Sequence, residues 1–363
     1  MAQRLIDIYF TSVFVEKLAS SIKRVYPTFD EKSFSNNILT EQWDRTNLKE
    51  RMHIISRTLG QFLPVTYKER ITILLKVELE FDGFEHLVFS DFVEMFGLEN
   101  FDISMNALEI LTRSSAEFAI RPFYIKYPQK TLEQMKQWST HTHDFVRRLA
   151  SEGSRPRLPW GMALPIFKKD PTPILCILEE LKNDPSESVR RSVANNLNDI
   201  SKDNPQIVID LAKKWIGKSE KIDSLLKHAL RGLLKKGNRD VLSLFGLQNS
   251  EGLSVKNSTI TPHEVCIGNS AQLTFTLIVD AYPHKKVRLE YEIGYKKANG
   301  MLSYKVFQIQ EKMFETGTYF FERKLRFDDM TTRKHYEGEH TLSVIVNGER
   351  FETVKFVLRI NIS

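Results

Sequence analysis

Cysteine is scarce in this sequence of 363 residues, which contains only Cys176 and Cys266. Two distant cysteines exclude a disulfide framework and a cysteine-rich zinc site, and they suit a reducing compartment such as the cytoplasm. The nine histidines show no HExxH or similar ligand spacing, and the densest pair stands in HTHDF at 141–145. We therefore expect no metal site.

Long hydrophobic runs are also missing. No apolar stretch approaches the roughly 20 residues that a membrane span requires. The segment MAQRLIDIYFTSVF (1–14) has an aspartate within its apolar run and no small-residue cleavage site, so we do not interpret it as a signal peptide. Hydrophobic residues make up 41% and charged residues 27% of the chain, as in globular proteins. We expect a cytoplasmic protein without a membrane partner, long enough for two domains.

The apolar pattern changes late in the chain. Up to about residue 248 apolar residues recur at helical spacing, as in NLKERMHIISRTLGQFL (47–63). After LQNSEGLSVKNSTITP (247–262) most segments alternate, as strands do. The expected strands are 272–279, 288–295, 302–309, 319–327, 340–346 and 351–362. Their number is typical of an immunoglobulin-like sandwich, although the Cys…Trp…Cys signature of antibody domains is absent. We predict a helical domain over 1–250 and a β-sandwich domain over 255–363.

The helical part repeats itself. FVRRLASEG (145–153) returns as SVRRSVANNLNDI (188–200), and a fainter copy, LLKHALRGLL, follows at 225–234. Two helices in about 40 residues is the period of HEAT-like repeats, which stack so that the second helices line a concave wall. The predicted fold class is an all-α HEAT-like repeat superhelical solenoid followed by an all-β immunoglobulin-like sandwich.

Basic pairs stand at equivalent places in these copies. The net charge of +6 and the pI near 9.0 permit an anionic partner. A solvated helix face would explain any single pair. Three pairs in register on one face instead suit successive phosphates along a duplex, so the repeat favours nucleic-acid binding.

The stretch VRRLASEGSRPRLPWG (146–161) surrounds one carboxylate, Glu152, with cations, and two prolines precede Trp160. Its arginines are Arg147, Arg148, Arg155 and Arg157. The stretch could be a basic loop in which Glu152 merely neutralises an arginine. Alternatively it is a DNA-facing corner, in which a carboxylate repelled by phosphate persists only if it meets something positive.

Two further acids stand close to arginine. Glu117, in SSAEFAIRPF, is expected on a helix ahead of Arg121, and Asp199, in ANNLNDI, near the end of a helix where it shares a face with Asn195. Helix capping is the simpler explanation for Asp199. If each acid belongs to a successive repeat, Glu117, Glu152 and Asp199 would converge on one spot of the concave wall.

The strings VRRLASEGSRPRLPWG, FKKDPTPILCILEELKNDPSESVRRSVANNLNDISKDNP and SSAEFAIRPF closely resemble the AlkC family of bacterial DNA alkylation-repair glycosylases. The resemblance covers roughly residues 1–250. The C-terminal strands resemble the immunoglobulin-like domain that one branch of this family carries. The related AlkD family shares the helical-repeat architecture but not these strings.

This resemblance implies a monofunctional DNA glycosylase of base excision repair, without cofactor or metal. The enzyme would hydrolyse the N-glycosidic bond of small cationic bases, chiefly N3-methyladenine and also N3-methylcytosine, in double-stranded DNA. It would kink the duplex without fully flipping the base, and the sandwich would help to grip and bend the DNA. The implied protein is a monomer in the bacterial cytoplasm, associated with the nucleoid through DNA.

The resemblance also assigns residues. Three positions fall on the active-site acids: Glu117, Glu152 and Asp199. Three fall on DNA-contacting positions: Arg148, Arg155 and Trp160. The repeat adds three expected DNA contacts: Arg147, Arg190 and Arg191. The sequence shows no obvious lysine nucleophile beside the acids, so we expect no lyase step. A non-catalytic DNA-binding scaffold and a sensor of alkylation damage remain the alternative functions.

Overall fold

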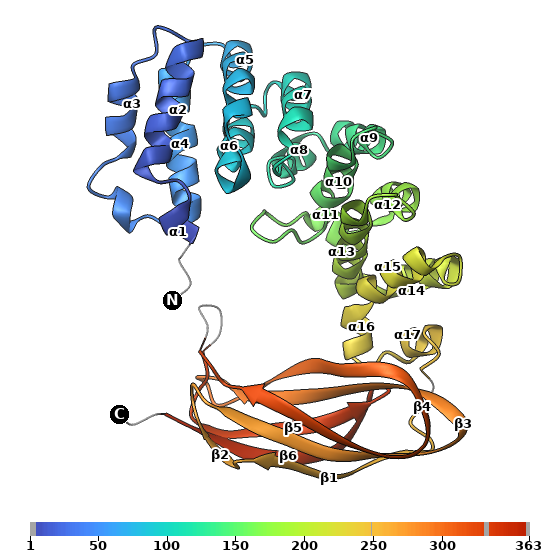
Figure 1. Ribbon diagram of the computed structural model, residues 1–363. Helices are drawn as coiled ribbons and strands as arrows, with labels where there is room; N and C mark the ends of the chain where they lie inside the picture. Colours follow the sequence, from blue (N-terminus) through green and yellow to red (C-terminus); the bar gives the residue numbers. More distant parts are fainter. Residues whose placement is uncertain (1–4, 248, 330–333, 361–363) are drawn as a thin grey trace. The chain divides into compact units, whose positions relative to one another are not determined.

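A computed structural model gives the structure of the chain and describes residues 5–247, 249–329 and 334–360 (Figure 1). Helices occupy the chain up to Leu244, and strands occupy it from Leu253 onward. The predicted order, an all-α repeat region followed by an all-β domain, is therefore confirmed. None of the described helices combines the length and apolar character needed to cross a membrane.

The N-terminal helices are paired and amphipathic. They are α1 (Leu5–Ile8), α2 (Ser12–Val25), α3 (Glu31–Ile38), α4 (Leu48–Phe62), α5 (Tyr67–Val77), α6 (Leu87–Phe96) and α7 (Phe101–Leu111). Short 3₁₀ turns lie at Trp43–Arg45, Glu78–Glu80 and Gly83–His86. The predicted helix over 47–63 is α4, which begins with a capping box of Asn47 and Glu50 and buries Met52, Ile55 and Leu59.

The repeats found in the sequence form the next helices. They are α8 (Arg121–Lys126), α9 (Pro128–Trp138), α10 (Asp144–Gly153), α11 (Pro165–Lys169), α12 (Leu175–Leu181), α13 (Glu187–Asp203), α14 (Pro205–Trp215), α15 (Glu220–Ala229), α16 (Arg231–Lys235) and α17 (Arg239–Leu244), with a 3₁₀ turn at Thr172–Ile174. The first two copies of the repeat lie on α10 and α13, and the third begins on α15 and continues into α16. Helix α13 packs against both α10 and α15.

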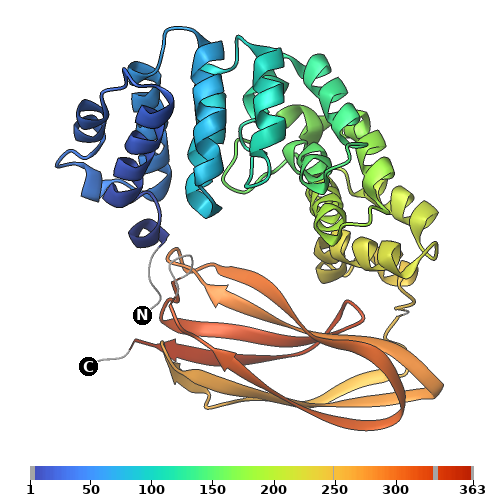
Figure 2. The ribbon, with the colours of Figure 1, turned by 45° about the horizontal axis from the view of Figure 1, so that its top comes forward.

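The stacked helices form an arc (Figures 1 and 2). Helices α10 and α13 lie on its inner side, and their partners α9 and α12 lie on its outer side. The apolar repeat positions Val146, Val189 and Val193 are buried between the layers. Because these positions point into the core, polar residues on the opposite face of α10 and α13 are presented to the inner wall.

The strands form one antiparallel-rich sheet that folds over its own core. They are β1 (Leu253–Thr261), β2 (Glu264–Cys266), β3 (Ser270–Lys296), β4 (Leu302–Arg326), β5 (Gly338–Val346) and β6 (Glu349–Arg359), in the order β1-β3-β5-β6-β2 with β4 paired to β3. Among the strands of the described residues, β2 and β6 alone pair in parallel. Alternate residues of β3, including Leu273, Phe275 and Leu277, fill the core.

The strand limits differ from those predicted. Strand β3 contains both 272–279 and 288–295, because it continues through an irregularity in register. In the same way β4 contains 302–309 and all of 319–327 except its last residue. The exposed Pro283 lies at the irregularity in β3, where a missing N–H is tolerated. Strands β1 and β2 were not predicted, and residues 361–362 of the last predicted strand lie outside the described residues.

The chain separates into two compact units: one extends to Val208 and includes Trp215–Ala229, and the other comprises Ile209–Lys214 and the chain from Leu230. Helices α16 and α17 thus belong with the sandwich. A Cβ on Gly237, after α16, would lie 2.8 Å from the carbonyl oxygen of Gly348, between β5 and β6. Both glycines have positive φ, so glycine permits both the turns and the close approach.

Candidate active site

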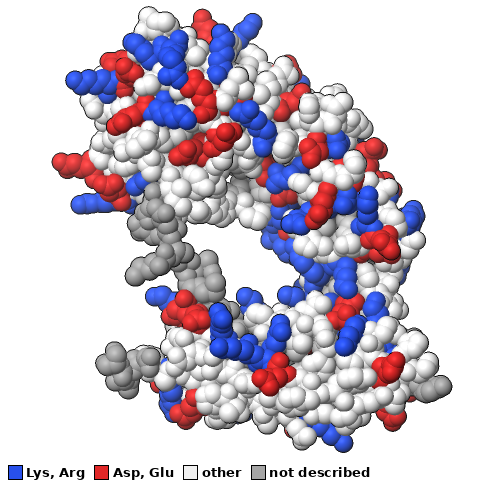
Figure 3. Space-filling model, viewed as in Figure 1, with Lys and Arg blue, Asp and Glu red and all other residues white. Residues whose placement is uncertain are grey.

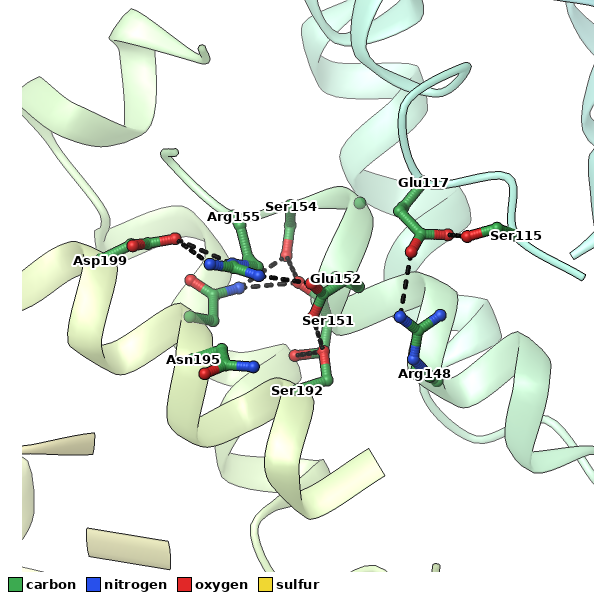
Figure 4. Close-up of polar contacts among 12 residues, drawn as sticks. Ser115, Glu117, Arg148, Ser151, Glu152, Ser154, Arg155, Ser192, Asn195 and Asp199 are labelled. Atoms are coloured by element: carbon green, nitrogen blue, oxygen red, sulfur yellow. Dashed lines mark hydrogen bonds and ion pairs between the residues drawn. The ribbon is translucent and has the colours of Figure 1, made fainter. Parts of the chain in front are cut away.

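Arg155 is the centre of a buried ion network at the end of α10. Its guanidinium contacts the carboxylate of Glu152 on α10, and its Nε donates to Oδ2 of Asp199 on α13 at 2.8 Å (Figure 4). The three side chains are only 9%, 8% and 2% exposed, respectively. Burial alone would lower the pKa of Arg155, but the two carboxylates outweigh burial and raise it. The structure thus brings two of the predicted acids together around one cation.

The second oxygen of Glu152 is held from the neighbouring repeat. Ser192 Oγ on α13 donates to Glu152 Oε2 at 2.7 Å. The amide of Asn196 donates to the carbonyl oxygen of Ser151 at 2.8 Å and fixes the same turn of α10. Glu152 therefore has little rotational freedom.

Asp199 lies inside α13 and caps no helix. Its Oδ1 accepts from Lys202 Nζ at 2.8 Å, one helical turn away. A lysine therefore stands beside one of the acids, where the sequence showed no obvious lysine nucleophile. The i, i+3 spacing of Asp199 and Lys202 on one helix was the signal that could have revealed it.

Glu117 forms a second, separate ion pair. It lies in the turn between α7 and α8, not on a helix as expected. Its Oε1 accepts from Arg148 Nη2 at 3.0 Å, and its Oε2 accepts from Ser115 Oγ at 2.7 Å and from the Ala116 amide at 3.0 Å (Figure 4). Burial would raise the pKa of Glu117, but Arg148 and these hydrogen bonds hold it below its ordinary value. Glu117 therefore remains an anion well into the acidic range.

A cavity of about 360 Å³ lies between the Arg155 network and the pair Arg148–Glu117. Glu117 and Glu152 both line it, whereas Asp199 does not. The rest of the wall is mostly apolar and includes Phe10, Leu48, Met52, Phe84, Leu87, Phe118, Leu158, Pro159 and Trp160. Several of these residues come from the first 90 positions, which carried no recognisable motif, so sequence reasoning missed them.

Trp160 stands at this cavity with 67% of its surface exposed. Its φ of 66° is in the left-handed region, which a bulky residue rarely adopts. Lys49 Nζ donates to its carbonyl oxygen at 3.3 Å, and the edge of its ring meets Phe84 at 5.9 Å between centroids. The surroundings thus hold a large aromatic ring out into solvent.

The repeated arginines Arg147 and Arg190 have a structural task. Arg147 donates to the carbonyl oxygens of His141 and Thr142 and pairs with Asp184. Arg190 donates to the carbonyl oxygens six and five residues before it, the same offsets as for Arg147. Each arginine thus secures the loop that leads into its own helix, which gives their recurrence a reason independent of DNA.

The other basic residues lie closer to solvent. Arg191 is exposed and pairs with Glu187 on the same helix, and Arg157 pairs with Asp203. Figure 3 shows lysine and arginine side chains gathered around α11 and α13 on the inner side of the helical unit. A surface with many positive charges attracts polyanions.

Within the described residues, no group of three or more His, Cys, Asp and Glu side chains could hold a metal ion. In the HTHDF segment the rings of His141 and His143 are 5.5 Å apart, and His141 Nε2 lies 3.6 Å from Glu109.

Comparisons with known proteins agree across the chain. Residues 111–233 match the family model of DNA alkylation repair enzymes, and residues 254–360 match that of the C-terminal Ig-like domain of the uncharacterised protein YhaZ. The chain is 43% identical to the uncharacterized protein YhaZ of Bacillus subtilis, over 94% of this chain and 96% of that protein. It is 37% identical to the alkylpurine DNA glycosylase AlkC of Pseudomonas fluorescens, solved bound to DNA with an abasic site analog. That similarity covers 98% of this chain and all of that one, with a TM-score of 0.94.

Proposed function

Because the chain belongs to the AlkC-like DNA alkylation repair family, we propose that it is a monofunctional DNA glycosylase of base excision repair. Its substrates are small cationic alkylated bases in duplex DNA, N3-methyladenine and also N3-methylcytosine. The observation that carries this proposal is the pair of carboxylates, Glu117 and Glu152, in the wall of an otherwise apolar cavity beside an exposed tryptophan.

Recognition rests on charge. An N3-methylated base carries a formal positive charge, which is attracted to carboxylates and to the faces of aromatic rings. In an apolar cavity this attraction is stronger than in water. A neutral adenine gains none of it and still loses its hydration, so the cavity discriminates against normal bases.

Excision needs little acid catalysis. When the bond between C1′ and the base nitrogen breaks, the cationic base takes the electron pair and leaves neutral, and the sugar becomes oxocarbenium-like. Glu152 then stabilises the positive sugar and accepts the proton of the water that adds to C1′. Asp199 does not line the cavity and acts on this step through Arg155, which it holds against Glu152. Arg155 keeps both acids in place, and Glu117 faces the base. Lys202 is held by Asp199, and we assign it no covalent step.

Binding uses the inner surface of the helical domain (residues 1–250). Arg148, Arg191 and the loop around Trp160 contact the strand with the lesion, while Arg147, Arg155 and Arg190 act mainly through the positions of their neighbours. Trp160 packs on the sugar or base at a kink, so full flipping of the base is unnecessary. Bending costs on the order of several kcal/mol, which phosphate contacts offset. The sandwich domain (255–363) grips the duplex, and the protein acts as a monomer.

The test is release of free base from a methylated duplex. The wild type should release N3-methyladenine under single-turnover conditions, and Glu152→Gln should release almost none while still binding DNA. Glu133→Gln, an exposed acid on the outer helix α9, is the matched control and should behave as the wild type. A scaffold or a damage sensor would bind the duplex and release no base from any variant.

A further inference from the structure

Arg121 is the first residue of α8, and its side chain is fully buried. Its guanidinium donates to three backbone carbonyl oxygens: Nη1 to Gly153 at 3.2 Å, Nη2 to Arg155 at 2.8 Å, and Nε to Met162. Among the described residues, no carboxylate accepts a hydrogen bond from it. A buried arginine that binds only backbone is unusual, because a buried charge is stabilised best by an opposite charge.

In the sequence, the three residues whose carbonyl groups bind Arg121 lie just after Glu152 and on both sides of Trp160. Gly153 directly follows Glu152, and Met162 lies two residues after Trp160. Arg121 therefore ties together both ends of the loop that carries the acid, its arginine partner and the exposed tryptophan. The packing is tight, because a Cβ on Gly161 would lie 3.1 Å from Arg121 Cδ.

From this geometry we infer that Arg121 is a positioning residue, which sets Glu152 and Trp160 at a fixed separation for base excision. The planar guanidinium has five donors in a rigid fork and can bind three carbonyls in different directions at once, which an ammonium cannot. Burial, and then the charge of Arg155, lower the pKa of Arg121 to about 10, so it stays charged at neutral pH.

The role predicts a loss in rate and not in binding. A displacement of 1 Å in a reacting group can cost about 10²-fold in rate. Arg121→Met should therefore reduce the single-turnover rate of base release by about 10- to 100-fold, with a much smaller change in DNA affinity. The rate of base release by Arg121→Lys should lie between the rates of the wild type and of Arg121→Met. Added guanidinium ion should partly restore Arg121→Ala, since it refills the site of the lost group, and should not restore Glu152→Gln.

The control is Arg70→Met on α5. Arg70 is half-buried and also donates to a backbone carbonyl, that of Pro64, but α5 contributes no residue to the cavity. Circular dichroism and thermal unfolding show how much of each variant is folded. If Arg121→Met is too unstable to assay, the inference is tested with Arg121→Lys and with the addition of guanidinium ion to Arg121→Ala. Each of these variants is assayed at a temperature at which it is folded.

This inference rests on the proposed function, and the two can fail separately. If the wild type releases no base, the proposed function fails. If the wild type releases base and folded Arg121→Met or Arg121→Lys releases it as fast, the inference is overturned. It is also overturned if the loss merely follows the unfolded fraction, as for Arg70→Met, and guanidinium ion restores nothing.

Discussion

The helical unit and the sandwich each bury an arginine between two carboxylates, with different results. In the sandwich, Arg288 on β3 pairs with Glu290 at 2.7 Å and with Glu311 on β4 at 3.0 Å, and all three side chains are at most 3% exposed. In the helical unit, Arg155 holds Glu152 and Asp199, but Glu152 also lines a cavity. Buried charge therefore does not by itself mark a functional site. A candidate functional site is marked by a buried charge that a substrate can reach.

The largest expected difference between the clusters is in catalysis. Glu152→Gln removes the negative charge beside the cavity and should reduce the rate of base release by roughly 10²-fold or more. Glu290→Gln should leave this rate unchanged at temperatures where the protein is folded. Single-turnover release of base from methylated duplex measures both. Equal losses of rate in Glu152→Gln and Glu290→Gln would show that the Arg155 cluster has only a structural role, like the Arg288 cluster.

Stability should show the reverse order. Glu290→Gln leaves Arg288 with one fewer charge partner in a sealed interior, and breaking a buried pair costs about 3–5 kcal/mol. Glu152→Gln should cost less, because the cavity admits water to the remaining network. Chemical denaturation monitored by circular dichroism compares the two free energies of unfolding. A smaller loss for Glu290→Gln would contradict the distinction between sealed and open clusters.

The pair Arg148–Glu117 is an intermediate case, and pH tests it. In the wild type, Arg148 and local hydrogen bonds hold the pKa of Glu117 below its ordinary value, so base release should persist until the pH falls through that lowered pKa. In Arg148→Met burial would be opposed only by the hydrogen bonds, the pKa should rise, and activity should be lost at higher pH on the acidic side. The pH profile of single-turnover rates measures this shift. An unmoved acidic limb would mean that the charge of Glu117 is not needed.

The smallest effect is expected for the exposed pair Arg191–Glu187, whose side chains are 66% and 73% exposed. Arg191→Ala should leave stability unchanged, because exposed pairs contribute little. It should weaken DNA binding slightly and reduce the slope of log K against log salt by about 1 if Arg191 contacts a phosphate. Affinities measured at several salt concentrations give the slope. An unchanged slope would remove Arg191 from the DNA-binding surface.

Sequence reasoning reached the parts of this site that are local or repeated. The copies at 145–153 and 188–200 placed Glu152 and Asp199 on equivalent helices, and the structure joins them through Arg155. The same repeat suggested DNA contact for Arg147 and Arg190, whose common offsets to loop carbonyls give a structural cause.

The remaining features depend on long-range packing. Phe10 and Phe84 line the cavity together with Trp160 although they are far from it in the sequence. No local sequence pattern predicts that these three rings share one cavity. Arg121 has no sequence signature, because its partners are backbone carbonyls, which every residue has. Strand β1 was missed because its run of polar residues around Asn257 interrupts the alternation, where the register also shifts.

The contact between Gly237 and Gly348 has a practical consequence for dissecting the protein. A fragment that stops at residue 250 would keep α16 and α17 but lack the surface of the sandwich against which they pack. Leu242 and its neighbours would then be exposed to solvent, and the fragment would tend to aggregate. A version cut just after Ala229 removes α16 and α17 together with the sandwich, and of the second unit it keeps only the segment Ile209–Lys214. Thermal unfolding of that version shows whether this remaining segment is still packed, so that a loss of activity can be assigned to the missing half.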